Sequence, residues 1–144
     1  MKRIISFFLS VLLLFGCVGI PVAAVNTEIM PYYNNILSTY SNFTIDSSGK
    51  GTVEASYRGY INVTDSVTVT IKIQKRSLGL IWTKVDIGTE NNEIVVTSTN
   101  TNDDFIYDVQ LKSTGNYRAV ITYTVSGSGG ADDSIEDICT AEYN

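Results

Sequence analysis

The chain has 144 residues, of which 44% are hydrophobic and 17% charged, and its formal net charge at neutral pH is −5. It contains no histidine, which excludes a Ser-His-Asp triad, a Cys-His nucleophile and a histidine-containing zinc site. The net negative charge argues against nucleic acid as a partner, because binding to phosphate backbones needs clustered lysine and arginine.

The N-terminus has the pattern of an export signal. Lys2 and Arg3 precede an uncharged apolar run over residues 4–16, and Val22-Ala23-Ala24 fits cleavage after Ala24. Such cleavage leaves 8 basic and 15 acidic residues, a net charge of −7. We therefore predict a signal peptide over residues 1–24 and a secreted, extracellular protein.

Two alternatives for this N-terminus stay open. The sequence Leu14-Phe15-Gly16-Cys17 resembles a bacterial lipoprotein box, in which Cys17 would carry a lipid anchor. Residues 4–25, left uncleaved, would be long enough to span a bilayer, which takes about 20 apolar residues. The small residues at the end of this segment favour cleavage, so we expect no membrane span after processing.

The rest of the chain divides into an N-terminal segment over residues 25–41 and one domain over residues 42–144. The segment holds the one helical candidate, residues 32–40. The domain is rich in Thr, Ser, Val, Ile and Tyr, and its apolar residues alternate with polar ones, which is typical of strands. The predicted strands, in chain order, cover residues 43–45, 53–61, 67–73, 81–87, 93–99, 105–111, 117–125 and 134–143.

Seven or eight short strands at about ten-residue spacing predict an all-β fold, an antiparallel β-sandwich with immunoglobulin-like architecture. The clearest alternation places Val67, Val69, Ile71 and Ile73 on the inward face. The same reasoning extends the inward faces of the neighbouring strands to Ile61 and Ile81. We expect a single monomeric domain.

Trp82, the single tryptophan of the chain, lies by strict alternation on an outward face with Lys84 and Asp86. Its ring could cover the sheet by packing on cross-strand neighbours, or on the N-terminal tyrosines Tyr32, Tyr33 and Tyr40. A bulge near residues 79–80 would instead turn the ring inward, because one extra residue reverses the face. A third interpretation is an exposed aromatic ring used for recognition.

Recognition of a protein or a glycan is the function that such aromatic rings favour, since they offer a large contact area at low entropy cost. The candidate binding residues are Trp82, Tyr57 and Tyr60.

The segment around Trp82 also carries a family resemblance. Ile71-Lys72-Ile73-Gln74-Lys75, a short turn, and then Trp82-Thr83-Lys84-Val85 resemble a hairpin in a group of small exported proteins from Gram-positive Firmicutes bacteria. Residues 115–119 (GNYRA) and 31–36 (PYYNNI) are similar to further motifs of that group, a domain of unknown function. The resemblance spans residues 28–143 and implies a secreted all-β module without supplying an activity.

The acidic residues suggest two further chemistries. Asp103 and Asp104, and likewise Asp132 and Asp133, are adjacent pairs. With Asn102 in the first loop and Ser134 in the second, they offer oxygen ligands of the kind that suits Ca²⁺. A carboxylate-dependent hydrolase is also possible, although adjacent carboxylates point to opposite faces of a strand and would need partners from other loops. The simpler interpretation is that acidic loops keep the sandwich soluble and block edge pairing.

Cys139 is the single cysteine left after either processing reaction, so no structural disulfide is expected. It shares the inward parity of Ile135, Ala141 and Tyr143, which favours a small buried apolar residue over a reactive thiol. Taken together, the sequence predicts a non-catalytic interaction module at or outside the cell surface, binding a protein or glycan. The alternatives are the hydrolase or calcium-binding accessory domain, and a purely structural exported protein.

Overall fold

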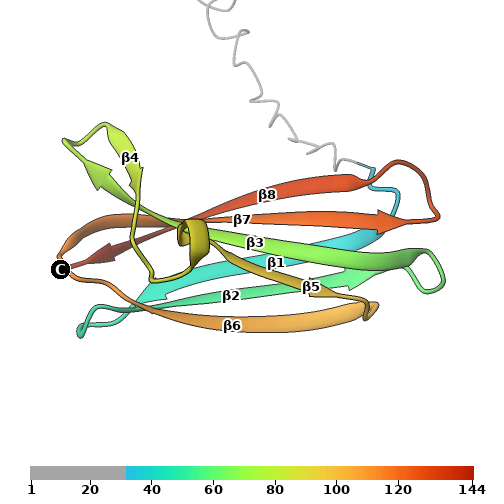
Figure 1. Ribbon diagram of the computed structural model, residues 1–144, viewed down its shortest axis with the longest axis horizontal. Coiled ribbons are helices and arrows are strands. Elements are labelled where there is room, and N and C mark those ends of the chain that lie inside the picture. The colour runs from blue at the N-terminus through green and yellow to red at the C-terminus, as the bar shows by residue number, and fades with distance from the viewer. Residues whose placement is uncertain (1–31) are drawn as a thin grey trace, which may run out of the picture. The chain divides into compact units, whose positions relative to one another are not determined.

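A computed structural model describes residues 32–144, so the predicted signal peptide, the lipoprotein box and Cys17 lie outside the described residues. Figure 1 shows eight strands and one short 3₁₀ turn, η1 (Glu90–Asn92). The strands are β1 (Ile36–Ile45), β2 (Lys50–Gly59), β3 (Thr64–Ser77), β4 (Ile81–Lys84), β5 (Ile94–Ser98), β6 (Asn102–Gln110), β7 (Gly115–Gly127) and β8 (Asp133–Tyr143).

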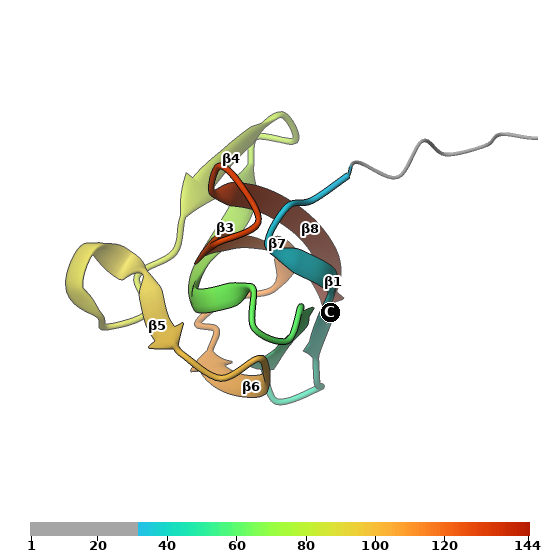
Figure 2. The ribbon, with the colours of Figure 1, turned by 90° about the vertical axis from the view of Figure 1, so that its right-hand side faces the viewer.

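The strands form two antiparallel sheets. One sheet has the order β1-β2-β6, and the other has the order β4-β3-β7-β8, with β5 also paired to β3. The long strand β3 accommodates both short partners because β5 pairs with residues 67–71 and β4 with residues 74–77. Figure 2 shows the two sheets face to face, with β1 beside β8 and β5 beside β6. The predicted all-β, immunoglobulin-like antiparallel sandwich is confirmed.

The core lies between the sheets and follows the two-residue period of the strands. Every second residue is buried over residues 67–73 of β3 and 117–125 of β7, and Ile71 faces Ile121 in register. Opposite them, β2 contributes Val53, Ala55 and Tyr57. Full burial of one such large side chain contributes about 1.5–3 kcal/mol, so the central strands supply most of the apolar stabilisation.

The helical candidate at residues 32–40 is wrong, because strand β1 begins at Ile36. The domain therefore starts inside the segment 25–41 that the sequence analysis separates from it. The reason lies in the inward-facing positions of β1, where Thr39 and Ser41 stand between Ile36 and Phe43. Polar residues are tolerated there because both hydroxyls donate to the Asp137 carboxylate. The apolar alternation that identifies a strand is therefore missing from β1.

Two apolar residues expected inside are exposed. Ile61 is 78% exposed because β2 ends at Gly59 and the chain turns, with Thr64 N–H donating to the Tyr60 carbonyl. Ile81 is 58% exposed because β4 has four residues and lies at the tip of a hairpin. Val85 and Ile87, beyond this strand, pack against the core as expected.

Within residues 32–144, no helix has the length and apolarity needed to cross a membrane.

Candidate functional site

The outer face of the three-stranded sheet carries a group of polar side chains, next to the exposed Ile106 of β6. The register places Tyr40 of β1, Ser56 of β2 and Asp104 of β6 side by side in one row. The next row contains Ser38, Arg58 and Asn102 from the same three strands. Cross-strand neighbours on one face lie within interaction distance, so these six residues form one unit, which we call the β2 platform.

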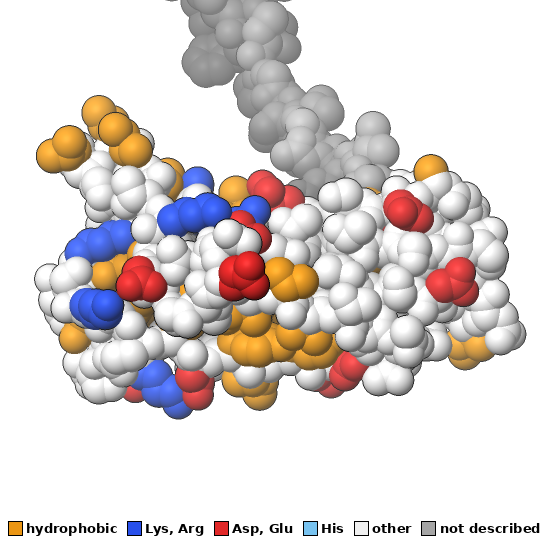
Figure 3. Space-filling view, in the orientation of Figure 1, with side chains coloured by type: hydrophobic (Ala, Val, Ile, Leu, Met, Phe, Trp, Pro, Cys, Tyr) orange, Lys and Arg blue, Asp and Glu red, His pale blue; other side chains and the backbone are white. Residues whose placement is uncertain are grey.

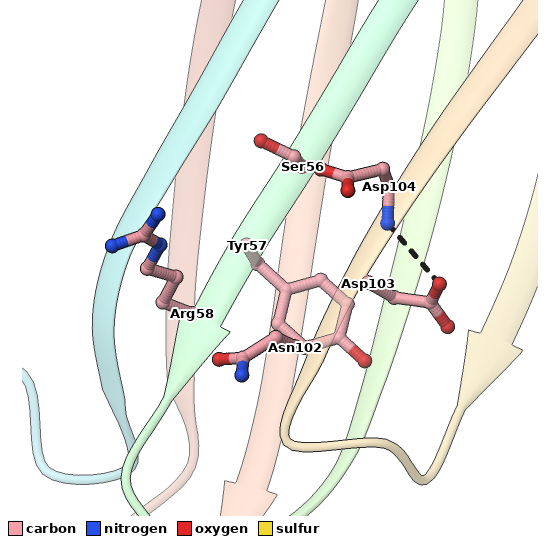
Figure 4. Close-up of a pocket in the computed structure, with 6 residues that line it drawn as sticks. All are labelled: Ser56, Tyr57, Arg58, Asn102, Asp103 and Asp104. Carbon is pink, nitrogen blue, oxygen red and sulfur yellow. Dashed lines mark hydrogen bonds between the residues drawn. The ribbon is translucent and has the colours of Figure 1, made fainter.

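Two open pockets flank β2 on this platform. The larger, of about 550 Å³, lies on the β6 side and is lined by Ser56, Tyr57, Arg58, Asn102, Asp103 and Asp104 (Figure 4). The smaller, of about 250 Å³, lies on the β1 side and includes Tyr40. Both pockets are lined by Ser56 and Arg58, so a ligand lying across β2 would contact both.

The charged groups of the platform are available to a ligand. None of the four ion pairs recorded within residues 32–144 involves Arg58 or Asp104. Tyr40 is 57% exposed. The platform thus combines an aromatic ring, a guanidinium with five donors, a carboxylate, an amide and two hydroxyls.

Two residues predicted for a site lie beneath this platform and have structural roles. Tyr57 is buried in the core, and its hydroxyl donates to the Asn100 carbonyl at 2.8 Å. The Asp103 carboxylate accepts hydrogen bonds from Ser98 Oγ at 2.7 Å and Asn100 Nδ2 at 3.0 Å, which lower its pKa. Tyr57 therefore does not offer its ring to a ligand, and both residues instead fix the turn between β5 and β6.

The second acidic pair is also divided between core and solvent. Asp133 is buried, and its carboxylate accepts the backbone N–H groups of Asn34 at 3.0 Å and Asn35 at 2.6 Å. Asp132 is exposed in the preceding turn. No group of three or more His, Cys, Asp or Glu side chains able to hold a metal occurs in the described part of the chain, so the calcium hypothesis gains no ligand cluster there.

Trp82 lies on the outward face of the five-stranded sheet, as strict alternation predicts. Its ring packs against the Arg118 guanidinium at 4.5 Å and lies 6.0 Å from that of Arg76, its cross-strand partner. The ring therefore packs on cross-strand neighbours and is not turned inward by a bulge. An open pocket of about 390 Å³ beside the ring is also lined by Asn116 and Glu142.

The three predicted binding residues do not form one surface. Tyr60 is partly exposed in the turn between β2 and β3, at the opposite end of the sandwich from β4 and Trp82 (Figure 1). Tyr57 lies between the sheets.

A polar cluster that the sequence analysis did not find supports the platform from inside. Ser41 Oγ donates to Asp137 at 2.8 Å and lies 2.8 Å from the Tyr123 hydroxyl, which donates to the Tyr40 carbonyl at 2.9 Å. Burial raises the pKa of Tyr123 to about 12. Burial also raises the pKa of the Cys139 thiol, which packs beside this cluster.

This cluster holds the backbone of Tyr40 against the core, so the platform rests on a fixed strand. The sequence did contain a sign of this cluster, because the polar residues Ser41 and Asp137 occupy inward-facing positions in their strands.

Neither a scan against protein-family models nor a search of curated proteins gives a match to this chain. The resemblance to exported Firmicutes proteins remains a prediction.

Proposed function

We propose that the protein is an exported, non-catalytic interaction module that binds a glycan on the β2 platform. The observation that carries this proposal is the pair of open pockets that adjoin across β2 and share Ser56 and Arg58. Sugars present hydroxyl groups along their edges and C–H groups on their faces. Arg58, Asn102 and Asp104 supply donors and acceptors for the hydroxyl groups. The exposed ring of Tyr40 supplies a stacking surface for the C–H face.

The interactions of the Asp103 and Asp104 carboxylates favour binding over hydrolysis. Glycoside hydrolysis uses two carboxyl groups on either side of the scissile bond. On the platform, the Asp104 carboxylate is free of ion pairs, whereas that of Asp103 is held by Ser98 and Asn100. If the hydrolase alternative were right, the purified protein would cleave its ligand, and Asp104→Asn would abolish the cleavage.

The test is a binding screen of the purified protein against glycans and isolated cell walls. Tyr40→Ala and Arg58→Ala should each weaken binding at least about tenfold, which corresponds to about 1.4 kcal/mol. Thr44→Ala is the matched control, because Thr44 is exposed on the same face of β1 but outside both pockets. Unchanged affinity in both platform variants would contradict the proposal, as would a partner that is a protein alone.

A further inference from the structure

The β3–β4 hairpin ends in an apolar tip that projects into solvent. Leu78 is 92% exposed and Leu80 is 83% exposed, and Ile81 follows them. Figure 3 shows these apolar side chains at the end of the hairpin that stands out from the sheets in Figure 1. Exposed apolar side chains grouped in this way are a feature of interaction sites.

The turn itself is unfavourable for leucine. Leu78 and Gly79 both have positive φ, 51° and 71°, and the turn closes with Leu80 N–H donating to the Ser77 carbonyl at 3.2 Å. Turns with two positive φ values prefer asparagine, aspartate or glycine at the first position, and a leucine there is strained. Neither core packing nor local conformation favours leucine at position 78, and strain of this kind is concentrated at functional sites.

The hairpin is layered along its length. Behind the apolar tip comes Trp82, with the guanidinium groups of Arg76 and Arg118 over its ring, and neither arginine has an ion-pair partner in the described residues. Lys75 lies on the other face of the hairpin, where its Nζ donates to Ser113 Oγ. The hairpin from Gln74 to Val85 contains three cations and no carboxylate, although the protein as a whole is acidic. Of these cations, Lys84 is paired with Glu93 outside the hairpin. Figure 3 shows the Lys and Arg side chains gathered toward this end of the molecule.

We propose that this hairpin docks on an anionic lipid surface. The hairpin presents an apolar tip, then an aromatic ring and then cations. A bilayer has the matching order from its centre outward, with hydrocarbon first, then the interface and then the headgroups. An apolar pocket on a partner protein would accept the leucines but would not require this order. The inference is independent of the β2 platform, which belongs to the other sheet.

The experiment uses the purified protein with phosphatidylcholine vesicles prepared with and without phosphatidylglycerol. Trp82 is the single tryptophan, so its fluorescence reports on the hairpin directly. We expect binding to the anionic vesicles, weakened by salt, together with quenching of Trp82 by lipids brominated on their acyl chains. Arg76→Gln should reduce the preference for anionic vesicles.

The decisive variant is Leu78→Asn combined with Leu80→Ser. Asparagine suits the positive φ of position 78, so the hairpin should keep its fold, which thermal unfolding checks. We expect at least about tenfold weaker vesicle binding. Val95→Ser is the matched control, because Val95 is an exposed apolar residue of the same sheet outside the hairpin, and it should bind like the parent.

Three outcomes would overturn the proposal. They are absence of binding to anionic vesicles, Trp82 fluorescence that brominated lipids leave unquenched, and parental affinity in the leucine variant. Docking of a protein that needs Leu78, with no vesicle binding, would also overturn it.

Discussion

At the scale of single residues, Tyr123 links the interior to the proposed binding surface. Its ring is fully buried, and its hydroxyl holds the Tyr40 carbonyl while lying beside Ser41. Removing the hydroxyl would take this donor from the Tyr40 carbonyl, while Ser41 would keep its hydrogen bond to Asp137. Loss of a partner in the interior costs more than the hydrogen bond itself contributes.

Tyr123→Phe should therefore destabilise the protein by about 1–2 kcal/mol at neutral pH. The pKa of Tyr123 is raised to about 12 in the folded state, above its unfolded value of about 10. Its stabilising contribution is thus complete below pH 10 and is lost as the pH rises from about 10 to about 12. Denaturant unfolding of both proteins across this range should show the deficit of the variant shrinking, and a constant deficit would contradict the assignment.

Cys139 gives a second prediction at this scale. Its thiol is partly buried, and burial raises its pKa, so the reactive thiolate is scarce at neutral pH. A thiol reagent should label the folded protein much more slowly than the urea-unfolded protein. Equal rates, or a disulfide-linked dimer on a non-reducing gel, would show that the thiol is accessible.

At the scale of elements, β1 depends on ties to the end of the chain. Asp133 accepts the backbone N–H groups of Asn34 and Asn35, and the Asn35 side chain donates to the Ala131 carbonyl at 2.8 Å. These bonds join the start of β1 to the start of β8. They replace part of the apolar packing that β1 lacks at Thr39 and Ser41.

Asp133→Ala should destabilise the protein by about 2 kcal/mol, because two backbone donors lose a charged acceptor in the interior. Asp132→Ala is the matched control, since the neighbouring carboxylate is exposed, and its effect should stay within about 0.5 kcal/mol. Urea unfolding measures both variants. Equal effects of the two substitutions would mean that Asp133 does not tie β1 to β8.

The elements also show what the sequence could and could not predict. Strands β3 and β7 were found with their inward faces because their apolar residues alternate without interruption. Strand β1 was missed because its inward positions include Thr39 and Ser41, whose partners come from β8, far along the chain. The exposure of Ile81 was missed because periodicity does not reveal where a hairpin leaves the sheet.

At the scale of the whole molecule, the sandwich presents two outer faces of different character. The three-stranded sheet carries the β2 platform, whose residues come from three strands and are brought together by register. No local motif predicts such a site, and of its six members only Asn102 and Asp104 were among the candidate residues. The five-stranded sheet carries the β3–β4 hairpin with Trp82. Local alternation did place Trp82 on the outward face.

The most direct test of the proposed function is to map the ligand contact in solution. Backbone amide chemical shifts of the purified protein would be followed by NMR during titration with the glycan that binds best in the screen. Glycan binding on the β2 platform predicts that the shifts concentrate at Ser38, Tyr40, Ser56, Arg58, Asn102 and Asp104. Shifts confined to the Trp82 end of the molecule, or absent from the outer face of β2, would contradict it.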